Sequence, residues 1–202
     1  MKINQFAAFL FCNLLVCNVL SSQSDWKLKI DKKGIQIYTL DVPDFKFKSF
    51  KAVTKVNAPL QDALDVLTND QDFEKWVYKY LGGEIVKRVS DTEVYFYSAT
   101  DLPWPFSDRD DVTNVKIIKN PDGSILIDMK DYPDYLPPKK SRVRIPFMKG
   151  YWELTPLEDE KTEIVLEILA DPGGAIPAWI VNPFITSGPF KTFQNLKEML
   201  GN

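Results

Sequence analysis

Apolar and polar residues alternate with a period of two in several separate runs of this 202-residue chain, which is typical of strands with one buried face. The alternating or β-rich runs cover residues 35–40, 45–56, 85–89, 94–99, 112–118, 125–129, 142–147, 151–157 and 162–170. Short turns separate many of these runs, as at Asn120-Pro121-Asp122-Gly123, and they predict an antiparallel meander. Within 45–56 the parity changes, which predicts a bulge or a break near Ser49.

Two short helices are predicted between the first strands and the meander. Pro59 stands where the first helix would open, and apolar residues follow it at helical spacing, namely Leu60, Ala63, Leu64 and Leu67. The second helix can be capped by Asn69 or Asp70, and its apolar residues are Phe73, Trp76, Val77 and Tyr80. We expect Gly82 and Gly83 to end this second helix.

The C-terminal segment predicts a long amphipathic helix that begins near Pro177. Its apolar face consists of Ile176, Trp179, Ile180, Phe184, Phe193, Leu196 and Leu200. Pro183 and Pro189 each remove a backbone hydrogen bond, so a kink or a break is expected there. A helix of this kind must bury its apolar face, and the concave face of the sheet is the available partner. The pattern therefore predicts an α+β domain with space for an apolar ligand between sheet and helix.

Residues 1–22 have the pattern of an export signal. Lys2 supplies a basic start, and the apolar stretch 6–20 follows it. This stretch of about 15 residues is short for a membrane span. We expect cleavage near Ser22, which leaves residues 23–202 as one periplasmic or secreted domain. A retained membrane anchor is the alternative. Lipid modification of Cys17 is disfavoured, because Val16 before it is not small.

The missing residue types exclude several classes of function. The chain has no histidine, and both of its cysteines, Cys12 and Cys17, lie in the expected signal. Catalysis by a Ser-His-Asp or Cys-His site and zinc binding by His and Cys are therefore impossible. The net charge of −3 gives no basic surface for nucleic acid, and no glycine-rich phosphate loop is present. We expect no cofactor and no metal.

Three acids cluster around one arginine at the expected start of a strand. Asp108, Asp110 and Asp111 flank Arg109, and such carboxylates could hold a hard cation. The alternative is a set of solvated acids with one ion pair. We favour the ion pair, because calcium loops usually carry regularly spaced oxygen ligands and a turn glycine.

Three segments resemble the START family of lipid-binding domains. Leu102-Pro103-Trp104-Pro105-Phe106-Ser107-Asp108-Arg109-Asp110 resembles the Trp-Pro…Ser-x-Arg-Asp signature of that family. Val143-Arg144-Ile145…Gly150-Tyr151-Trp152-Glu153-Leu154-Thr155-Pro156 is similar to its strand pair before the last hairpin. Asp171-Pro172-Gly173-Gly174-Ala175-Ile176-Pro177-Ala178-Trp179-Ile180-Val181-Asn182 resembles the entry to its C-terminal helix. The motifs keep the family's order and spacing over residues 26–200.

The resemblance implies the START/Bet v 1-like helix-grip fold, in which a curved antiparallel sheet wraps around the C-terminal helix and one lipid fills an internal cavity. Sterol-related members place a buried acid and a buried arginine on neighbouring strands around the Arg-Asp motif. Counting without gaps puts Phe96 and Val115 at those positions, which disfavours a sterol-type polar anchor.

Each candidate site residue has a functional and a structural interpretation. Arg109 could meet a lipid headgroup, but we expect it to pair with a nearby acid. We expect Trp152 in the core, whereas Trp179 and Phe184 either pack against the sheet or line the cavity. Trp104 lies between two prolines, which favours contact with a membrane surface. The candidate cavity or lid residues are Phe96, Trp104, Arg109, Val115, Trp152, Ile176, Trp179, Ile180 and Phe184.

Our first hypothesis is therefore a monomeric, non-enzymatic carrier of a lipid or another apolar molecule, with transient membrane contact. The second is a cavity enzyme of the cyclase or hydrolase kind, which would need two carboxylates inside the cavity with raised pKa values. Asp128 and Glu153 are the first acids to examine for it. The third is an interaction module whose cavity is filled by side chains.

Overall fold

The computed structural model describes residues 25–201, so the expected signal 1–22 lies outside the described part. The strands of the sheet are β1 (Lys27–Lys32), β2 (Ile35–Leu40), β3 (Ser49–Val56), β4 (Tyr80–Ser90), β5 (Glu93–Thr100), β6 (Arg109–Lys119), β7 (Ile125–Asp131), β8 (Val143–Arg144), β9 (Phe147–Leu157) and β10 (Lys161–Asp171). The helices are α1 (Leu60–Thr68), a 3-10 turn η1 (Asp70–Asp72), α2 (Phe73–Trp76) and α3 (Ala178–Met199). This arrangement is the α+β, helix-grip architecture that the sequence predicts.

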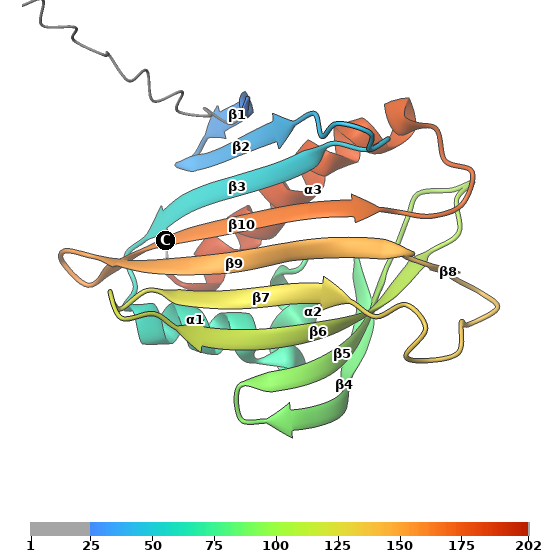
Figure 1. The fold of residues 1–202 in the computed structure, drawn as a ribbon. Coiled ribbons are helices and arrows are strands. Elements are labelled where there is room, and N and C mark those ends of the chain that lie inside the picture. The colour runs from blue at the N-terminus through green and yellow to red at the C-terminus, as the bar shows by residue number, and fades with distance from the viewer. Residues whose placement is uncertain (1–24, 202) are drawn as a thin grey trace, which may run out of the picture.

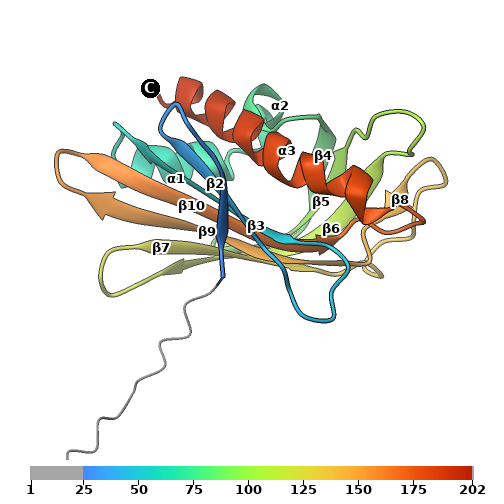
Figure 2. The ribbon, with the colours of Figure 1, turned by 90° about the horizontal axis from the view of Figure 1, so that it is seen from above.

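One sheet contains every strand, in the order β1-β2-β3-β10-β9-β7-β6-β5-β4, with β8 added beside β6. Pairing along this order is antiparallel, and only β8 runs parallel to its neighbour. The sheet curves, and α1, α2 and α3 all lie on its concave side (Figures 1 and 2). Register shifts at three places in the β4–β5 pair contribute to this curvature, because each bulge bends its strand.

The main core lies where the C-terminal half of α3 meets β2, β3 and α2. Phe193 and Leu196 of α3 are fully buried there against Ile35, Ile37 and Ala52 of the sheet. Two hydrogen bonds join α3 to the segment around α2: Asn195 Nδ2 donates to the Trp76 carbonyl at 3.3 Å, and Thr192 Oγ1 accepts from the Tyr78 amide at 3.1 Å. The last turns of α3 are therefore held firmly on the sheet.

Several predicted elements are confirmed closely. Residues 35–40 form β2 with the expected bounds, and the parity change near Ser49 is real, because β3 begins only at that residue. The hairpin turn at Asn120 is also confirmed: the Gly123 amide donates to the Asn120 carbonyl at 3.1 Å. Gly123 has a φ of 86°, which a residue with a Cβ adopts only with strain.

Four expectations about elements were wrong. Gly82 and Gly83 lie within β4 and do not end α2, which stops at Trp76. Residues 142–147 do not form one strand, because β8 has two residues and Phe147 already belongs to β9. The helix α3 is continuous through both of its prolines, so a break there, one of the two expected outcomes, does not occur. Strand β1 was not predicted, because its largely exposed residues show no apolar alternation.

Candidate functional site

A cavity of about 650 Å³ lies between the concave face of the sheet and the helices. Its sheet walls are Phe50, Ile85, Val94, Phe96, Ser98, Thr100, Asp111, Thr113, Val115, Ile117, Ile127, Met129, Met148, Trp152, Leu166, Ile168 and Ala170. Its helical walls include Leu67, Phe73, Trp76, Gly188, Pro189 and Thr192. Most of these side chains are apolar, and the size is in the usual range for small-molecule and cofactor sites.

Strand geometry explains which residues reach the cavity. Apart from Glu93 at the turn, the wall residues of β5 are those with even numbers from Val94 to Thr100, and on β6 they are those with odd numbers from Asp111 to Ile117. Side chains of a strand alternate between the two faces, so these sets are the two concave faces of one antiparallel pair. The residues between them, such as Tyr97 and Val112, point to the convex side.

Aromatic rings form one wall of the cavity. The ring centroid of Phe73 lies 5.6 Å from that of Phe96 and 5.5 Å from that of Trp76. Trp76 in turn contacts Trp152 at 6.0 Å, and Trp152 stacks on Phe193 at 5.6 Å. This chain of rings continues into the main core, so the wall is fixed by packing on both sides.

Tyr80 adds a hydroxyl to the aromatic wall. Burial, together with the nearby carboxylates of Asp70 and Asp111, raises its pKa to about 12. The phenol therefore stays protonated. A Cβ on Gly83 would lie 2.5 Å from the Tyr80 hydroxyl and 2.5 Å from the Tyr97 carbonyl, so this glycine is required by close approach.

One carboxylate lies inside the cavity. Asp111 accepts hydrogen bonds from Ser98 Oγ at 2.6 Å and from Thr113 Oγ1 at 2.7 Å. Burial raises the pKa of Asp111, although both hydroxyls act to lower it. The side chain keeps an intermediate exposed fraction despite this desolvation, because the surface it exposes belongs to the cavity.

A polar rim closes the far end of the cavity, at the turn between β4 and β5. Arg88, Asp91 and Glu93 line the cavity at this turn, and Asp70 of η1 lines it elsewhere. Together with Asp111, the cavity lining has four carboxylates and one guanidinium.

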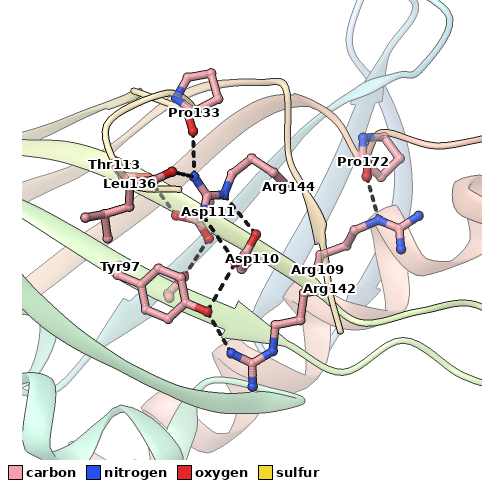
Figure 3. A network of polar contacts seen from close by, with 11 residues as sticks. Tyr97, Arg109, Asp110, Asp111, Thr113, Pro133, Leu136, Arg142, Arg144 and Pro172 are labelled. Carbon is pink, nitrogen blue, oxygen red and sulfur yellow. Dashed lines mark hydrogen bonds and ion pairs between the residues drawn. The ribbon is translucent and has the colours of Figure 1, made fainter. Parts of the chain in front are cut away.

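The convex face of β5 and β6 has a buried ionic network (Figure 3). Asp110 is fully buried and binds Arg144 through Nε–Oδ1 at 2.8 Å and Nη2–Oδ2 at 3.3 Å. Tyr97 donates to Asp110 at 3.2 Å and accepts from Arg142 at 2.7 Å. Arg144 also donates to the carbonyls of Pro133 and Leu136, so the network ties the loop after β7 to β6.

Arg109 does not have the acid partner that we expected. Its guanidinium donates to the carbonyls of Ser107, Pro172 and Gly173, the last at 3.1 Å. Burial lowers the pKa of Arg109, but a guanidinium so far above neutrality stays charged. Arg109 thus joins the loop before β6 to the Asp-Pro-Gly-Gly turn before α3. Asp110 and Asp111 point to opposite faces of β6, and no cluster of three potential metal ligands occurs in residues 25–201.

The structure brings only part of the predicted site together. Phe96, Val115 and Trp152 line the large cavity. Ile176, Ile180 and Phe184 instead surround a separate space of about 40 Å³, which they share with Leu102, Pro103 and Phe106. Trp104 and Trp179 are exposed over 92% and 75% of their surface, so neither is a core residue. Arg109 lines neither space.

Sequence reasoning missed the polar group of the cavity, which consists of Ser98, Asp111 and Thr113. Strand parity could have found it, because Asp111 shares a face with Val115. The two acids examined first were the wrong ones. Asp128 is exposed, and Glu153 lies one residue away from Trp152 on the opposite face of β9.

Comparison with known proteins decides the family. The START domain profile matches residues 12–202, nearly the whole chain. The chain belongs to the START family. Within residues 25–201, no helix of this START domain is both long and apolar enough to cross a bilayer.

Three relatives place the START domain more closely. A STAR-related lipid transfer protein from Xanthomonas axonopodis superposes with a TM-score of 0.81 at 34% identity, over 88% of this chain and 99% of that one. An uncharacterized protein of Pseudomonas aeruginosa is 32% identical over 86% of each chain. The phosphatidylcholine transfer protein of Mus musculus is 25% identical, over 79% of this chain and 76% of that one.

Proposed function

We propose that this START domain binds one lipid-like amphiphile in its large cavity and carries it between membranes, without chemical conversion. The observation that carries the proposal is a cavity of about 650 Å³ that side chains leave open and line mainly with apolar groups. Each methylene group buried there is worth about 0.8 kcal/mol relative to water, but almost nothing relative to a bilayer interior. The domain would therefore act mainly by lowering the barrier for crossing water.

One end of the molecule fits transient docking on a membrane. Trp104 and Trp179 are exposed there, and their neighbours Pro103, Ile176 and Ile180 line one small apolar space between them. Tryptophan is the side chain that favours the interface between water and lipid. Export to the periplasm or the medium is part of the proposal and is supported by the apolar stretch 6–20.

The open cavity favours a carrier over the two alternatives. An interaction module would have its cavity filled by side chains, and this one is not. Asp128 and Glu153, the two acids considered for an enzyme with paired carboxylates, both lie outside the cavity. The fold also hosts enzymes elsewhere, so the proposal rests on the cavity lining and not on the fold.

Native mass spectrometry of the purified domain tests the proposal, followed by solvent extraction and identification of the released lipid. We expect one amphiphile per chain, and we expect delipidated protein to take up one molecule again from vesicles. A domain that purifies empty and stays empty after incubation with vesicles would contradict lipid binding.

A further inference from the structure

Asp110 and Asp111, two neighbouring acids on β6, differ in the groups that contact their carboxylates. Asp110 meets Arg144 through two N–O contacts on the convex face. Asp111 faces the cavity and is held only by two hydroxyls, Ser98 Oγ and Thr113 Oγ1. Hydroxyl groups orient a carboxylate but supply no counter-charge. An ionised carboxylate taken out of water without a cation is costly, so the empty cavity favours the protonated form of Asp111 and a cation beside it would favour the ionised form.

No cation of residues 25–201 lies within ion-pairing distance of Asp111. Arg144 is committed to Asp110 and to two carbonyls on the other face. Arg88, the one guanidinium of the cavity lining, lies opposite Val94 on β5, whereas Asp111 lies opposite Ser98. Four residues of strand separate those positions, about 13 Å at the usual rise. Any cation that pairs with Asp111 therefore has to come with the ligand.

The rest of the cavity favours the same sign of ligand charge. Carboxylates outnumber guanidinium groups by four to one along the lining, which disfavours a fatty acid or any other anionic head. The next concave residue from Ser98 along β5 is Phe96, whose ring contacts that of Phe73. Aromatic faces beside a carboxylate suit a cation, which the ring quadrupole attracts.

We propose that Asp111, oriented by Ser98 and Thr113, is the polar anchor of the cavity and selects amphiphiles whose polar end bears a positively charged nitrogen. This inference rests on the proposed lipid binding and adds the chemical class of the head. A neutral alcohol could donate a hydrogen bond to Asp111 but would leave its charge uncompensated. A cationic nitrogen supplies both the hydrogen bond or contact and the charge.

The test uses three amphiphiles with one dodecyl chain and different heads: dodecylammonium, dodecanol and dodecanoate. Delipidated wild-type domain is titrated with each at neutral pH. Tryptophan fluorescence gives the affinity, because Trp76 and Trp152 line the cavity, and native mass spectrometry gives the stoichiometry. We expect dodecylammonium to bind at least about ten-fold more tightly than dodecanol, and dodecanoate to bind most weakly.

Three variants locate the preference. Asp111→Asn keeps the shape and the hydroxyl partners, and it should bring dodecylammonium down to the affinity of dodecanol while leaving dodecanol unchanged. Asp111→Glu should keep the preference. Asp128→Asn is the matched control, because it removes an exposed carboxylate that lies outside the cavity, and it too should keep the preference.

The outcomes separate the two proposals. Equal affinities for all three heads in the wild type, or a preference that survives in Asp111→Asn, would overturn the inference and leave lipid binding standing. A preference lost equally in Asp128→Asn would show a general charge effect and also overturn it. If none of the three amphiphiles binds the wild type, the proposed function itself fails and the inference with it.

Discussion

Each face of β6 carries an aspartate and a valine, but the surroundings of these residues differ between the two faces. On the convex face, Asp110 and Val112 are both almost fully buried, under the loop that Arg144 fastens to the strand. On the concave face, Asp111 and Val115 border open cavity. Burial on the convex side is completed by the protein itself, and the charge of Asp110 is matched by Arg144. Burial on the concave side is incomplete, and under the proposed function a ligand completes it.

This difference indicates where stability and function reside. A mutation on the convex face removes contacts that the folded chain already makes, so it should lower the free energy of unfolding. A mutation on the concave face changes contacts that form only with the ligand, so it should act on binding. The predictions below follow from this division and begin with the largest expected change.

Breaking the convex ion pair should have the largest effect on stability. Arg144→Met leaves Asp110 buried without a counter-charge, and we expect a loss of about 3–5 kcal/mol in the free energy of unfolding. Urea unfolding at neutral pH measures it. Lys55→Met is the control, since it removes a partly exposed ion pair with Glu163 at 3.6 Å and should cost less than about 1 kcal/mol. An equal loss of unfolding free energy in both variants would contradict the prediction that the buried ion pair contributes more to stability than the exposed one.

A large residue should be tolerated on one face of β6 and not on the other. Val112→Trp inserts a ring where no space exists and should destabilise the domain by about 1–3 kcal/mol or more. Val115→Trp places the same ring in the cavity, so it should cost less stability but abolish lipid uptake. Thermal melts and native mass spectrometry on the two variants make the comparison. Lipid uptake retained by Val115→Trp would contradict the assignment of this cavity as the binding site.

Asp111→Asn should change how stability depends on pH. Burial holds the pKa of Asp111 above its usual 3.8, so the folded state binds this proton more tightly than the unfolded state does. The wild type therefore loses stability as the pH rises from about 3.8 through the folded-state pKa. The asparagine side chain of the variant does not titrate, so the advantage of the variant should grow over this window and then level off. A constant difference from acid to neutral pH, measured by urea unfolding, would contradict a raised pKa.

Trp104→Ala should leave stability nearly unchanged, because the indole belongs to neither buried face. With 92% of its surface exposed, we expect a change within about 0.5 kcal/mol. Transfer of lipid between vesicles should nevertheless slow, because the docking side chain is lost, while equilibrium lipid binding stays the same. Leu28→Ala, on the edge strand β1, is the exposed apolar control. If transfer is unchanged in Trp104→Ala, docking by this residue is excluded.

The sequence predicted the strands well, but it did not predict which face of each strand borders the cavity. Alternation in residues 112–118 shows that Asp111, Thr113 and Val115 share a face. Alternation does not show which face is concave, because both are covered: Val112 and Thr113 are both almost fully buried, on opposite sides. The covering loop after β7 has no periodic pattern, so its contact with β6 could not be read from the sequence.

The C-terminal helix shows a second limit of the same kind. Helical spacing correctly placed Phe193 and Leu196 on the buried face. The same spacing put Trp179 and Phe184 on that face, but the first turns of α3 extend past the main core, so these side chains are exposed. Periodicity gives the direction of a side chain around a helix. It does not give how far along the helix the partner surface reaches.

Through its three carbonyl contacts, Arg109 couples the loop before β6 to the turn before α3, so that one cannot be displaced without the other. Its guanidinium holds Ser107 in the loop before β6 and holds Pro172 and Gly173 before α3. Displacing either segment breaks bonds from the same side chain and leaves a buried charge without acceptors. Amide hydrogens of both segments should therefore exchange with solvent through a common opening step, with one free energy and one response to urea. The release of a ligand past the start of α3 would then be limited by a cooperative unit that spans both segments.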